Sequence, residues 1–258
     1  MSAKGTVFGG SSDAYDRFMG RYSRQLAVAF ADFAGVHKPQ RALDVGAGTG
    51  ALTAELVARL GEERVAAAEP SPDYVATLHT RFPRADVRQA PAEQLPWEDD
   101  SFDSSLAQLV VVFLNDAPLA TRELARVTRP GGVVATCMWE VEGVEMMNAL
   151  NEIRKRLQPS GSSIATDYRD EESLRRLFEE AGLRDVETTR LEVSVEYETV
   201  EELWEPAIRV GGPGGPAVDQ FTPEQLVQGR AIFEEALGSP TGRYTLTGRA
   251  AAVRGFSG

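Results

Sequence analysis

Three glycines, Gly46, Gly48 and Gly50, stand between two segments of contrasting pattern. Residues 41–45 are a short apolar run typical of a buried strand, and residues 51–60 carry apolar side chains at helical spacing. Glycine permits a positive φ and lets a ligand approach the backbone closely. The helix that follows offers free amide groups at its N-terminus. The pattern therefore predicts a nucleotide-type ligand at a strand-to-helix turn.

Two carboxylates narrow the chemistry of this ligand. Asp44 stands two residues before Gly46, where its charge would repel a pyrophosphate and attract a cationic group. S-adenosylmethionine (SAM) fits this charge, because it carries an ammonium group and a sulfonium but no phosphate. Glu69 ends the next expected strand, 19 residues after Gly50, where an acid accepts hydrogen bonds from two ribose hydroxyls. Together the two acids indicate an adenosine-type ligand that bears positive charge.

A dinucleotide ligand remains an open alternative at this point. The spacing Gly46-x-Gly48-x-x-Ala51 also satisfies the looser dinucleotide fingerprint, which accepts alanine at its last position. Glu69 does not separate the two ligands, because SAM and NAD both carry ribose hydroxyls. An NAD(P)-dependent oxidoreductase is therefore kept beside a SAM-dependent enzyme.

The residues around this turn alternate between strand-like and helix-like segments. Strands that alternate with helices form a parallel sheet with right-handed crossovers, and such a sheet binds ligands at the carboxyl ends of its strands. Residues 129–132, which include a Pro-Gly-Gly run, are expected to form a tight turn. The expected strands are 41–45, 65–69, 85–89, 102–108 and 133–139, and the expected helices are 51–60, 70–82 and 119–127.

Segments on either side of this core complete the expected chain. Helical spacing over residues 13–33, weakened at Gly20, predicts a helical cap within residues 12–36. We expect one domain over residues 1–258, with a cofactor-binding core at 40–140 and a candidate lid or substrate insertion at 198–240. The C-terminal half is expected to contain helices at 144–157, 171–181, 201–210 and 223–237 and strands at 183–197 and 242–253.

Composition limits the classes of partner. The 258 residues include 27 basic and 39 acidic ones, a net charge of −12, and show no basic stripe for a phosphate backbone, so nucleic acid is not expected. No apolar run reaches about 18 residues and no signal segment follows the first residues, so we expect a cytoplasmic protein without membrane contact. One cysteine and two histidines make a metal site unexpected. The expected partner is a small molecule, and a homodimer is one candidate oligomeric state.

Four segments carry a family resemblance. They are 41–50 (RALDVGAGTG), 68–71 (AEPS), 90–97 with 100–103 (APAEQLPW and DSFD), and 126–132 (RVTRPGG). In this order they resemble the motifs of class I SAM-dependent methyltransferases, most closely the type 11 small-molecule branch that includes the ubiquinone and menaquinone C-methyltransferases. The resemblance implies SAM as the cofactor. It also implies an α/β fold with a Rossmann-like, doubly wound, seven-stranded sheet that is mostly parallel, with an antiparallel last strand.

By position, the resemblance assigns cofactor contacts. Residues 44–50 would hold the methionine part of SAM, and Glu69 would hold the ribose. Ala92 would meet the adenine through its backbone amide, and Trp97 would help to flank the ring. Family members often have aspartate at the position of Pro91, so here the adenine amino group must be bound by the backbone or from elsewhere. The implied cofactor-binding residues are Asp44, Gly46, Ala47, Gly48, Gly50, Glu69, Pro70, Ala92, Glu93, Gln108 and Leu109.

The sequence says less about which residues contact the molecule that accepts the methyl group. Tyr15 and Tyr22 in the cap and Trp139 at the end of the fifth expected strand are candidate substrate contacts, and no catalytic base is identified. Residues 107–110 lack the Asn/Asp-Pro-Pro-aromatic motif of enzymes that methylate amino groups of nucleic acids, which favours a small-molecule acceptor. We therefore predict methyl transfer from SAM to oxygen, carbon or nitrogen of a small molecule. A SAM-binding protein without methyl transfer is the other alternative.

Overall fold

A computed structural model describes residues 18–157, 167–210 and 221–258. The chain divides into two compact units, which are described separately. The predicted single domain, with its cap at 12–36 and lid at 198–240, stays a prediction. The core unit contains Ser23–Glu140, Thr166–Leu191 and Ala250–Gly258, and the second unit contains the described residues of Met1–Tyr22, Val141–Ala165 and Glu192–Arg249.

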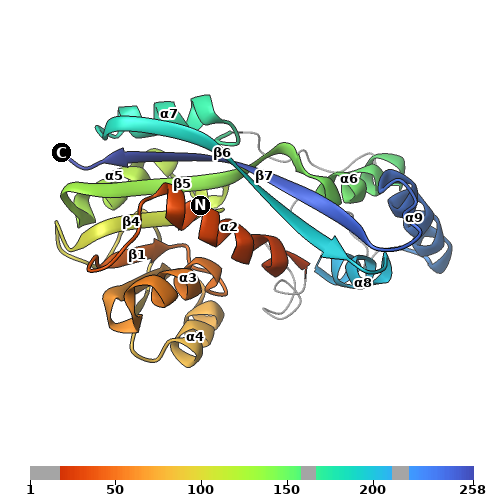
Figure 1. The fold of residues 1–258 in the computed structure, drawn as a ribbon, viewed down its shortest axis with the longest axis horizontal. Helices are drawn as coiled ribbons and strands as arrows, with labels where there is room; N and C mark the ends of the chain where they lie inside the picture. Colours follow the sequence, from red (N-terminus) through yellow and green to blue (C-terminus); the bar gives the residue numbers. More distant parts are fainter. Residues whose placement is uncertain (1–17, 158–166, 211–220) are drawn as a thin grey trace. The chain divides into compact units, whose positions relative to one another are not determined.

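Seven strands form one sheet in the order β3-β2-β1-β4-β5-β7-β6, with β7 antiparallel (Figure 1). The pairs β1–β2, β2–β3, β1–β4 and β4–β5 are all parallel. The chain therefore starts in the middle of the sheet, runs outward to β3 and then reverses to β4, which confirms the predicted doubly wound α/β fold. The strands are β1 (Ala42–Val45), β2 (Val65–Glu69), β3 (Asp86–Gln89), β4 (Phe102–Gln108), β5 (Thr128–Val144), β6 (Arg184–Tyr197) and β7 (Tyr244–Phe256).

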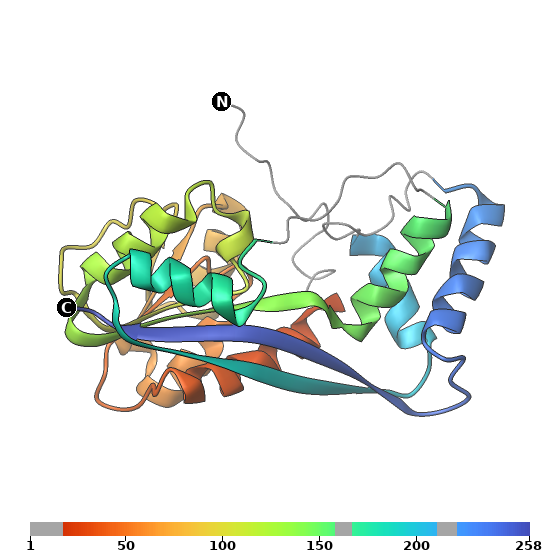
Figure 2. The same ribbon diagram turned by 90° about the horizontal axis from the view of Figure 1, so that it is seen from above.

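Helices of the core unit cover both faces of the sheet. Helix α3 packs against β1 and β2, and α4 packs against β2 and β3, whereas α5 packs against β4 and α7. Figure 2 shows α2 and α3 on one face of the sheet and α5 and α7 on the opposite face. These helices are α2 (Gly20–Phe33), α3 (Ala51–Leu60), α4 (Pro72–Arg81), α5 (Ala117–Val127) and α7 (Glu171–Glu180).

The central strands are buried along their whole length because helices lie on both sides. Every residue of β1 and β2 is buried, as expected for parallel strands inside a doubly covered sheet. One apolar layer joins Leu43 and Phe102 of the sheet to Leu124 of α5 and Phe178 of α7. A second layer, which includes Leu78 of α4 and Phe82 directly after it, covers the other face. The two layers fix the strand ends that carry the predicted site.

The expected tight turn at residues 129–132 is wrong. These residues belong to β5, which runs unbroken from Thr128 to Val144. The pairing of β4 with β5 shifts its register between Phe102 and Ser104, and the amide of Gly131 donates to the carbonyl of Ser257 at 2.9 Å. A Cβ at Gly132 would lie 2.7 Å from the carbonyl oxygen of Asp103. The glycines therefore serve a β-bulge in which two strands approach closely, rather than a chain reversal.

Other element boundaries differ from the sequence expectation by a few residues. Helix α5 begins at Ala117, because the side chain of Asp116 accepts a hydrogen bond from the amide of Leu119 at 2.8 Å and caps the helix. Helix α2 begins at Gly20, where the helical pattern is weakest. Residues 13–17 of the expected cap helix lie outside the described residues.

The described residues of the second unit include helices α6 (Glu145–Leu157), α8 (Glu201–Val210) and α9 (Pro223–Ala236), with the outer residues of β5, β6 and β7. Helix α6 packs against α9, where a Cβ at Gly229 would lie 3.4 Å from the side chain of Ile153. Trp204 and Phe233 join α8 to α9 with ring centroids 5.3 Å apart. None of the helices in the described segments has the length and apolarity needed to cross a bilayer.

Candidate functional site

The glycine loop connects the carboxyl end of β1 to the first turn of α3. Gly46 is packed tightly, because a Cβ there would lie 2.5 Å from Cγ2 of Val110. Gly50 is packed against α4, with Leu78 only 2.8 Å from its ideal Cβ position. Gly48 differs, since it has a φ of 54° and no heavy atom of the described chain lies within 4 Å of that position. The outer glycines therefore serve packing, and the middle glycine leaves room for a ligand at the backbone.

Glu69 holds this loop with its carboxylate. Oε2 accepts a hydrogen bond from the amide of Gly48 at 2.8 Å, and Oε1 accepts one from the amide of Ser71 at 2.9 Å. Burial raises the pKa of Glu69, and these two backbone hydrogen bonds act in the opposite direction. A carboxylate oxygen can accept more than one hydrogen bond, so ribose hydroxyls can bind here without displacing the loop.

Asp44 is the most deeply buried acid of the site, with 1% of its surface exposed. Its Oδ2 accepts a hydrogen bond from the hydroxyl of Thr53 on α3 at 2.6 Å. Burial, together with the charge of Glu69, raises the pKa of Asp44 to about 7, although the bond from Thr53 opposes the shift. A cationic ligand group beside Asp44 would stabilise its charged form.

The end of β4 supplies two further residues. Gln108 donates from Nε2 to the backbone carbonyl of Ser23 on α2 at 3.0 Å, and its buried Oε1 has no hydrogen-bond partner among the described residues. Leu109 follows with a φ of 61°, a left-handed conformation that is costly for a leucine, while its amide donates to the carbonyl of Cys137 at 2.9 Å. The chain thus turns away from the sheet sharply at the end of β4, beside Oε1 of Gln108, which can accept a hydrogen bond from a ligand.

Comparison with known proteins identifies the family. A family model described as a methyltransferase domain matches residues 43–136. A malonyl-[acyl-carrier protein] O-methyltransferase of Halorhodospira halophila is 30% identical over 217 residues, which are 81% of this chain and 71% of that protein. The chain belongs to the SAM-dependent methyltransferases. Its cofactor is SAM.

Solved structures share the fold of this methyltransferase. A putative methyltransferase of Bacillus halodurans superimposes with a TM-score of 0.57 at 14% identity, over 90% of this chain and 98% of that chain. A phosphoethanolamine N-methyltransferase of Haemonchus contortus, in complex with phosphomonomethylethanolamine and S-adenosylhomocysteine, gives a TM-score of 0.56 at 17% identity. That match covers 94% of this chain and 56% of that one.

The family decides between the ligands that the sequence left open, and the oxidoreductase alternative is not supported. The residues of the methyltransferase also fit SAM on structural grounds. Gly48 faces free space, Asp44 is a buried acid suited to a cation, and the Oε1 atom of Gln108 is a buried acceptor without a donor. No group of three His, Cys, Asp or Glu residues within the described segments is placed to hold a metal ion.

The structure corrects the expected role of Trp97 in this methyltransferase. Its indole donates to Asp86 at 2.8 Å and meets the ring of Phe102 edge to face, with centroids 5.5 Å apart. Asp86 and Phe102 are the first residues of β3 and β4, so Trp97 lies at the amino ends of the strands. Ligands of such sheets bind at the carboxyl ends, and Trp97 therefore cannot flank the adenine.

The remaining predicted cofactor contacts near the adenine stay predictions. Ala92 is buried and Pro70 is exposed beside Glu69. The carboxylate of Glu93 accepts hydrogen bonds from the amides of Asn115 and Asp116 at 2.8 and 3.2 Å. Glu93 thus already has a structural task, which the sequence did not indicate.

The candidate acceptor contacts fall in different parts of the chain. Tyr15 lies outside the described residues. Tyr22 is completely buried in the second unit, where burial and the neighbouring Tyr197 raise its pKa. Trp139 is buried in β5 of the core unit, and its carbonyl accepts a hydrogen bond from Arg169 at 3.4 Å. All three stay predictions as acceptor contacts.

Sequence reasoning missed two residues that shape the glycine loop. Thr53 holds Asp44, and Arg81 at the end of α4 donates to the carbonyl of Thr49. Thr53 lies two residues after the start of α3, close in sequence to the loop. Its helical spacing from the loop could therefore have indicated its contact with Asp44. Arg81 is 32 residues from its partner, and no local pattern connects the two.

Proposed function

We propose that this methyltransferase transfers the methyl group of SAM to a small organic acceptor, with the cofactor held at the carboxyl ends of β1, β2 and β4. The observation that carries the proposal is the open space at Gly48, whose amide donates to the buried carboxylate of Glu69, with the buried acid Asp44 four residues earlier in the chain. In this arrangement the loop from Asp44 to Gly50 holds the methionine part, and Glu69 holds the ribose. The amide of Ala92 meets the adenine.

The residues of the chain bind and orient, and we assign no catalytic base. When bound, SAM supplies a methyl carbon activated by a positive sulfonium, which becomes a neutral thioether on transfer. Asp44 offers its carboxylate to the ammonium group of the methionine part, and Gln108 offers Oε1 as a second acceptor. Correct positioning can supply about 7–11 kcal/mol of the barrier reduction in well-oriented systems.

The acceptor is a small molecule rather than a nucleic acid in this proposal. The net charge of −12 opposes binding to a phosphate backbone. The Halorhodospira halophila relative is named for O-methylation of malonyl-[acyl-carrier protein], so acceptors with a carboxylate oxygen are the first to test. Tyr15, Tyr22 and Trp139 remain our candidates for acceptor contacts.

The test is a screen for S-adenosylhomocysteine release from SAM in the presence of candidate acceptors, beginning with malonyl thioesters. The Glu69→Ala variant serves as the control for the site. Release that depends on an acceptor and is lost in Glu69→Ala supports the proposal. SAM binding without release, across carboxylate, hydroxyl, amine and carbon acceptors, would instead support a SAM-binding protein without methyl transfer.

A further inference from the structure

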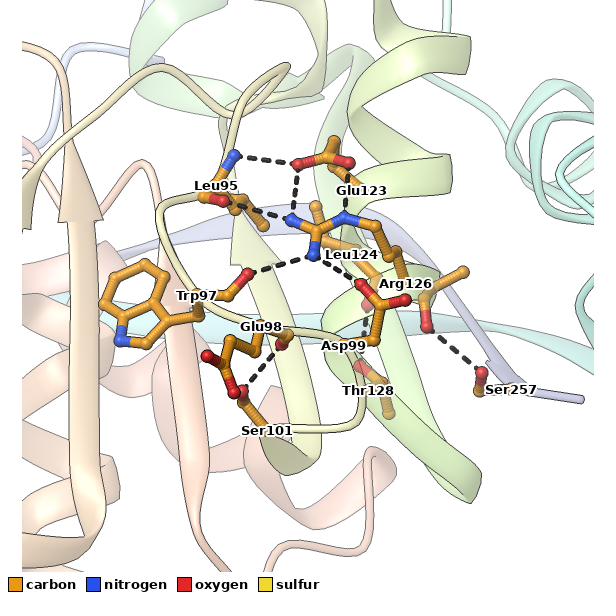
Figure 3. Close-up of polar contacts among 11 residues, drawn as sticks. Leu95, Trp97, Glu98, Asp99, Ser101, Glu123, Leu124, Arg126, Thr128 and Ser257 are labelled. Carbon is orange, nitrogen blue, oxygen red and sulfur yellow. Dashed lines mark hydrogen bonds and ion pairs between the residues drawn. The ribbon is translucent and has the colours of Figure 1, made fainter.

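Helix α5 is joined near both of its ends to the loop between β3 and β4, and Figure 3 shows the contacts of its last turn. In its last turn, Arg126 donates to the backbone carbonyls of Leu95 at 3.0 Å and Trp97 at 2.9 Å. Glu123, one turn earlier, accepts a hydrogen bond from the amide of Leu95 at 2.9 Å. Just before the helix, the amides of two residues bind the carboxylate of Glu93 at 2.8 and 3.2 Å. The helix therefore holds the loop at two places.

Arg126 uses every N–H group of its guanidinium in this arrangement. Two bonds go to Glu123 at 2.7 and 2.8 Å, and one goes to Asp99 at 2.8 Å, in addition to the two backbone carbonyls. Hydrogen bonds to Glu123 and Asp99 raise the pKa of Arg126, and Arg126 lowers the pKa of Glu123. The pair therefore stays charged over the physiological pH range. Lysine, with a single ammonium group, cannot reproduce five bonds in one plane.

The last turn of α5 is itself fixed to the sheet. Thr128 donates from its hydroxyl to the carbonyl of Leu124 at 2.7 Å, and Ser257 donates to the carbonyl of Ala125 at 3.1 Å (Figure 3). Since Thr128 begins β5 and Ser257 follows β7, the turn that carries Arg126 is tied to two strands. Arg126 thus connects the loop to a rigid part of the core unit.

Glu93 binds the loop to the other end of α5. Its acceptor oxygen receives the amides of Asn115 and Asp116, which immediately precede the helix. A carboxylate at this end also interacts favourably with the helix dipole. The residue before Glu93 is Ala92, whose amide our proposed function assigns to the adenine. Within the loop itself, the backbone hydrogen bond from Gln94 to Pro91 at 3.2 Å gives only local order.

We propose that Glu93 and Arg126 are positioning residues that fix the loop around Ala92 for the adenine of SAM, without touching the cofactor themselves. This inference rests on the proposed function. A loop that is already ordered loses less conformational entropy on binding, so the two residues raise the affinity for SAM. Without them, part of the binding free energy would be spent on ordering residues 92–97.

The test compares SAM affinities of the full chain by calorimetry, at a temperature where circular dichroism shows each variant to be folded. Glu93→Ala and Arg126→Met are each expected to raise the Kd for SAM about tenfold. Adenosine should lose affinity by the same factor, because the defect lies at the adenine. Glu93→Gln, which keeps an acceptor oxygen, should remain within about threefold of the wild type.

Two matched controls separate positioning from charge. Glu98→Ala removes an exposed acid from the same loop, and Arg122→Met removes an exposed base from the same helix. Both should bind SAM as the wild type does. Unchanged SAM affinity in Glu93→Ala would overturn the inference, and so would an equal loss of affinity in Glu98→Ala. If Arg126→Met does not fold, the result for Glu93→Ala is sufficient to test the inference. If the wild type failed to bind SAM, the proposed function itself would fall.

Discussion

Replacing Asp44 by asparagine should make the protein more stable above neutral pH and weaken its binding of SAM. The side chain is 1% exposed, and burial is the main cause that raises its pKa from the ordinary 3.8 to about 7. That difference corresponds to about 4 kcal/mol of destabilisation once the buried carboxyl is ionised. Asparagine removes the charge and keeps an oxygen that can accept the hydrogen bond from Thr53.

The direction of the pH effect follows from the protons bound in each state. Between pH 3.8 and about 7, Asp44 is ionised in the unfolded chain but protonated in the folded one. The folded chain therefore holds the additional proton, and its stability falls as the pH rises through this range and then becomes constant. From pH 5 to pH 8, the wild type should lose about 3 kcal/mol relative to Asp44→Asn.

Urea unfolding of the wild type and Asp44→Asn between pH 5 and pH 8 measures this difference directly. Titrating groups that do not interact with Asp44 are common to both proteins and cancel in the comparison. Binding should change in the opposite sense, with a Kd for SAM about 10- to 100-fold higher in Asp44→Asn at pH 8, because a charged hydrogen bond contributes about 1.5–3 kcal/mol. A stability difference that does not vary with pH would refute the reasoning.

Substitutions at three further positions test the loop and the strand end. Gly46→Ala should lose about 2–4 kcal/mol of stability in urea unfolding, because its Cβ would lie 2.5 Å from Val110 at a positive φ. Gly48→Ala should lose only about 1–2 kcal/mol, from its φ of 54°, yet bind SAM at least about tenfold more weakly. Leu109→Gly should be more stable than Leu109→Ala by about 1 kcal/mol, because residue 109 has a φ of 61°.

Each of these variants has a result that would contradict the expectation for it. Equal stability losses at residues 46 and 48 would contradict the difference in packing between the two glycines. Undiminished SAM binding by Gly48→Ala would show that the free space is not the ligand site. If Leu109→Ala were the more stable of the two variants, the strained backbone at the end of β4 would not be a feature of the folded protein.

The parts of the fold that the sequence predicts are those fixed by neighbouring residues. The apolar run of β1, the glycines after it and the helical spacing of α3 are local, and they placed Glu69 at the end of β2 as found. The bulge at 129–132 could not be predicted, because Pro-Gly-Gly suits a turn and the deciding partner, Ser257, is more than 120 residues away. The expectation that depends on residues close in sequence is therefore correct, and the one that depends on a distant residue is wrong.

The same limit applies to the candidate site. Asp44 and Gly48 were predicted because their types and spacing relate directly to the chemistry of the ligand. Trp97 was misplaced, because an aromatic residue near an expected adenine loop suits stacking equally well, and only its bond to Asp86 shows where it lies. The partners of Arg126 include two backbone carbonyls 29 and 31 residues away, which carry no side-chain signal in the sequence.

Titration of SAM into the wild type and the Glu69→Ala variant by calorimetry tests the central claim most directly. We expect one saturable site in the wild type and a Kd at least about 100-fold higher in Glu69→Ala, since two hydrogen bonds from the ribose to a charged acceptor are lost along with the bond to Gly48. NADH should give no heat of binding. A wild type that does not bind SAM, or a Glu69→Ala variant that binds it equally well, would contradict the account.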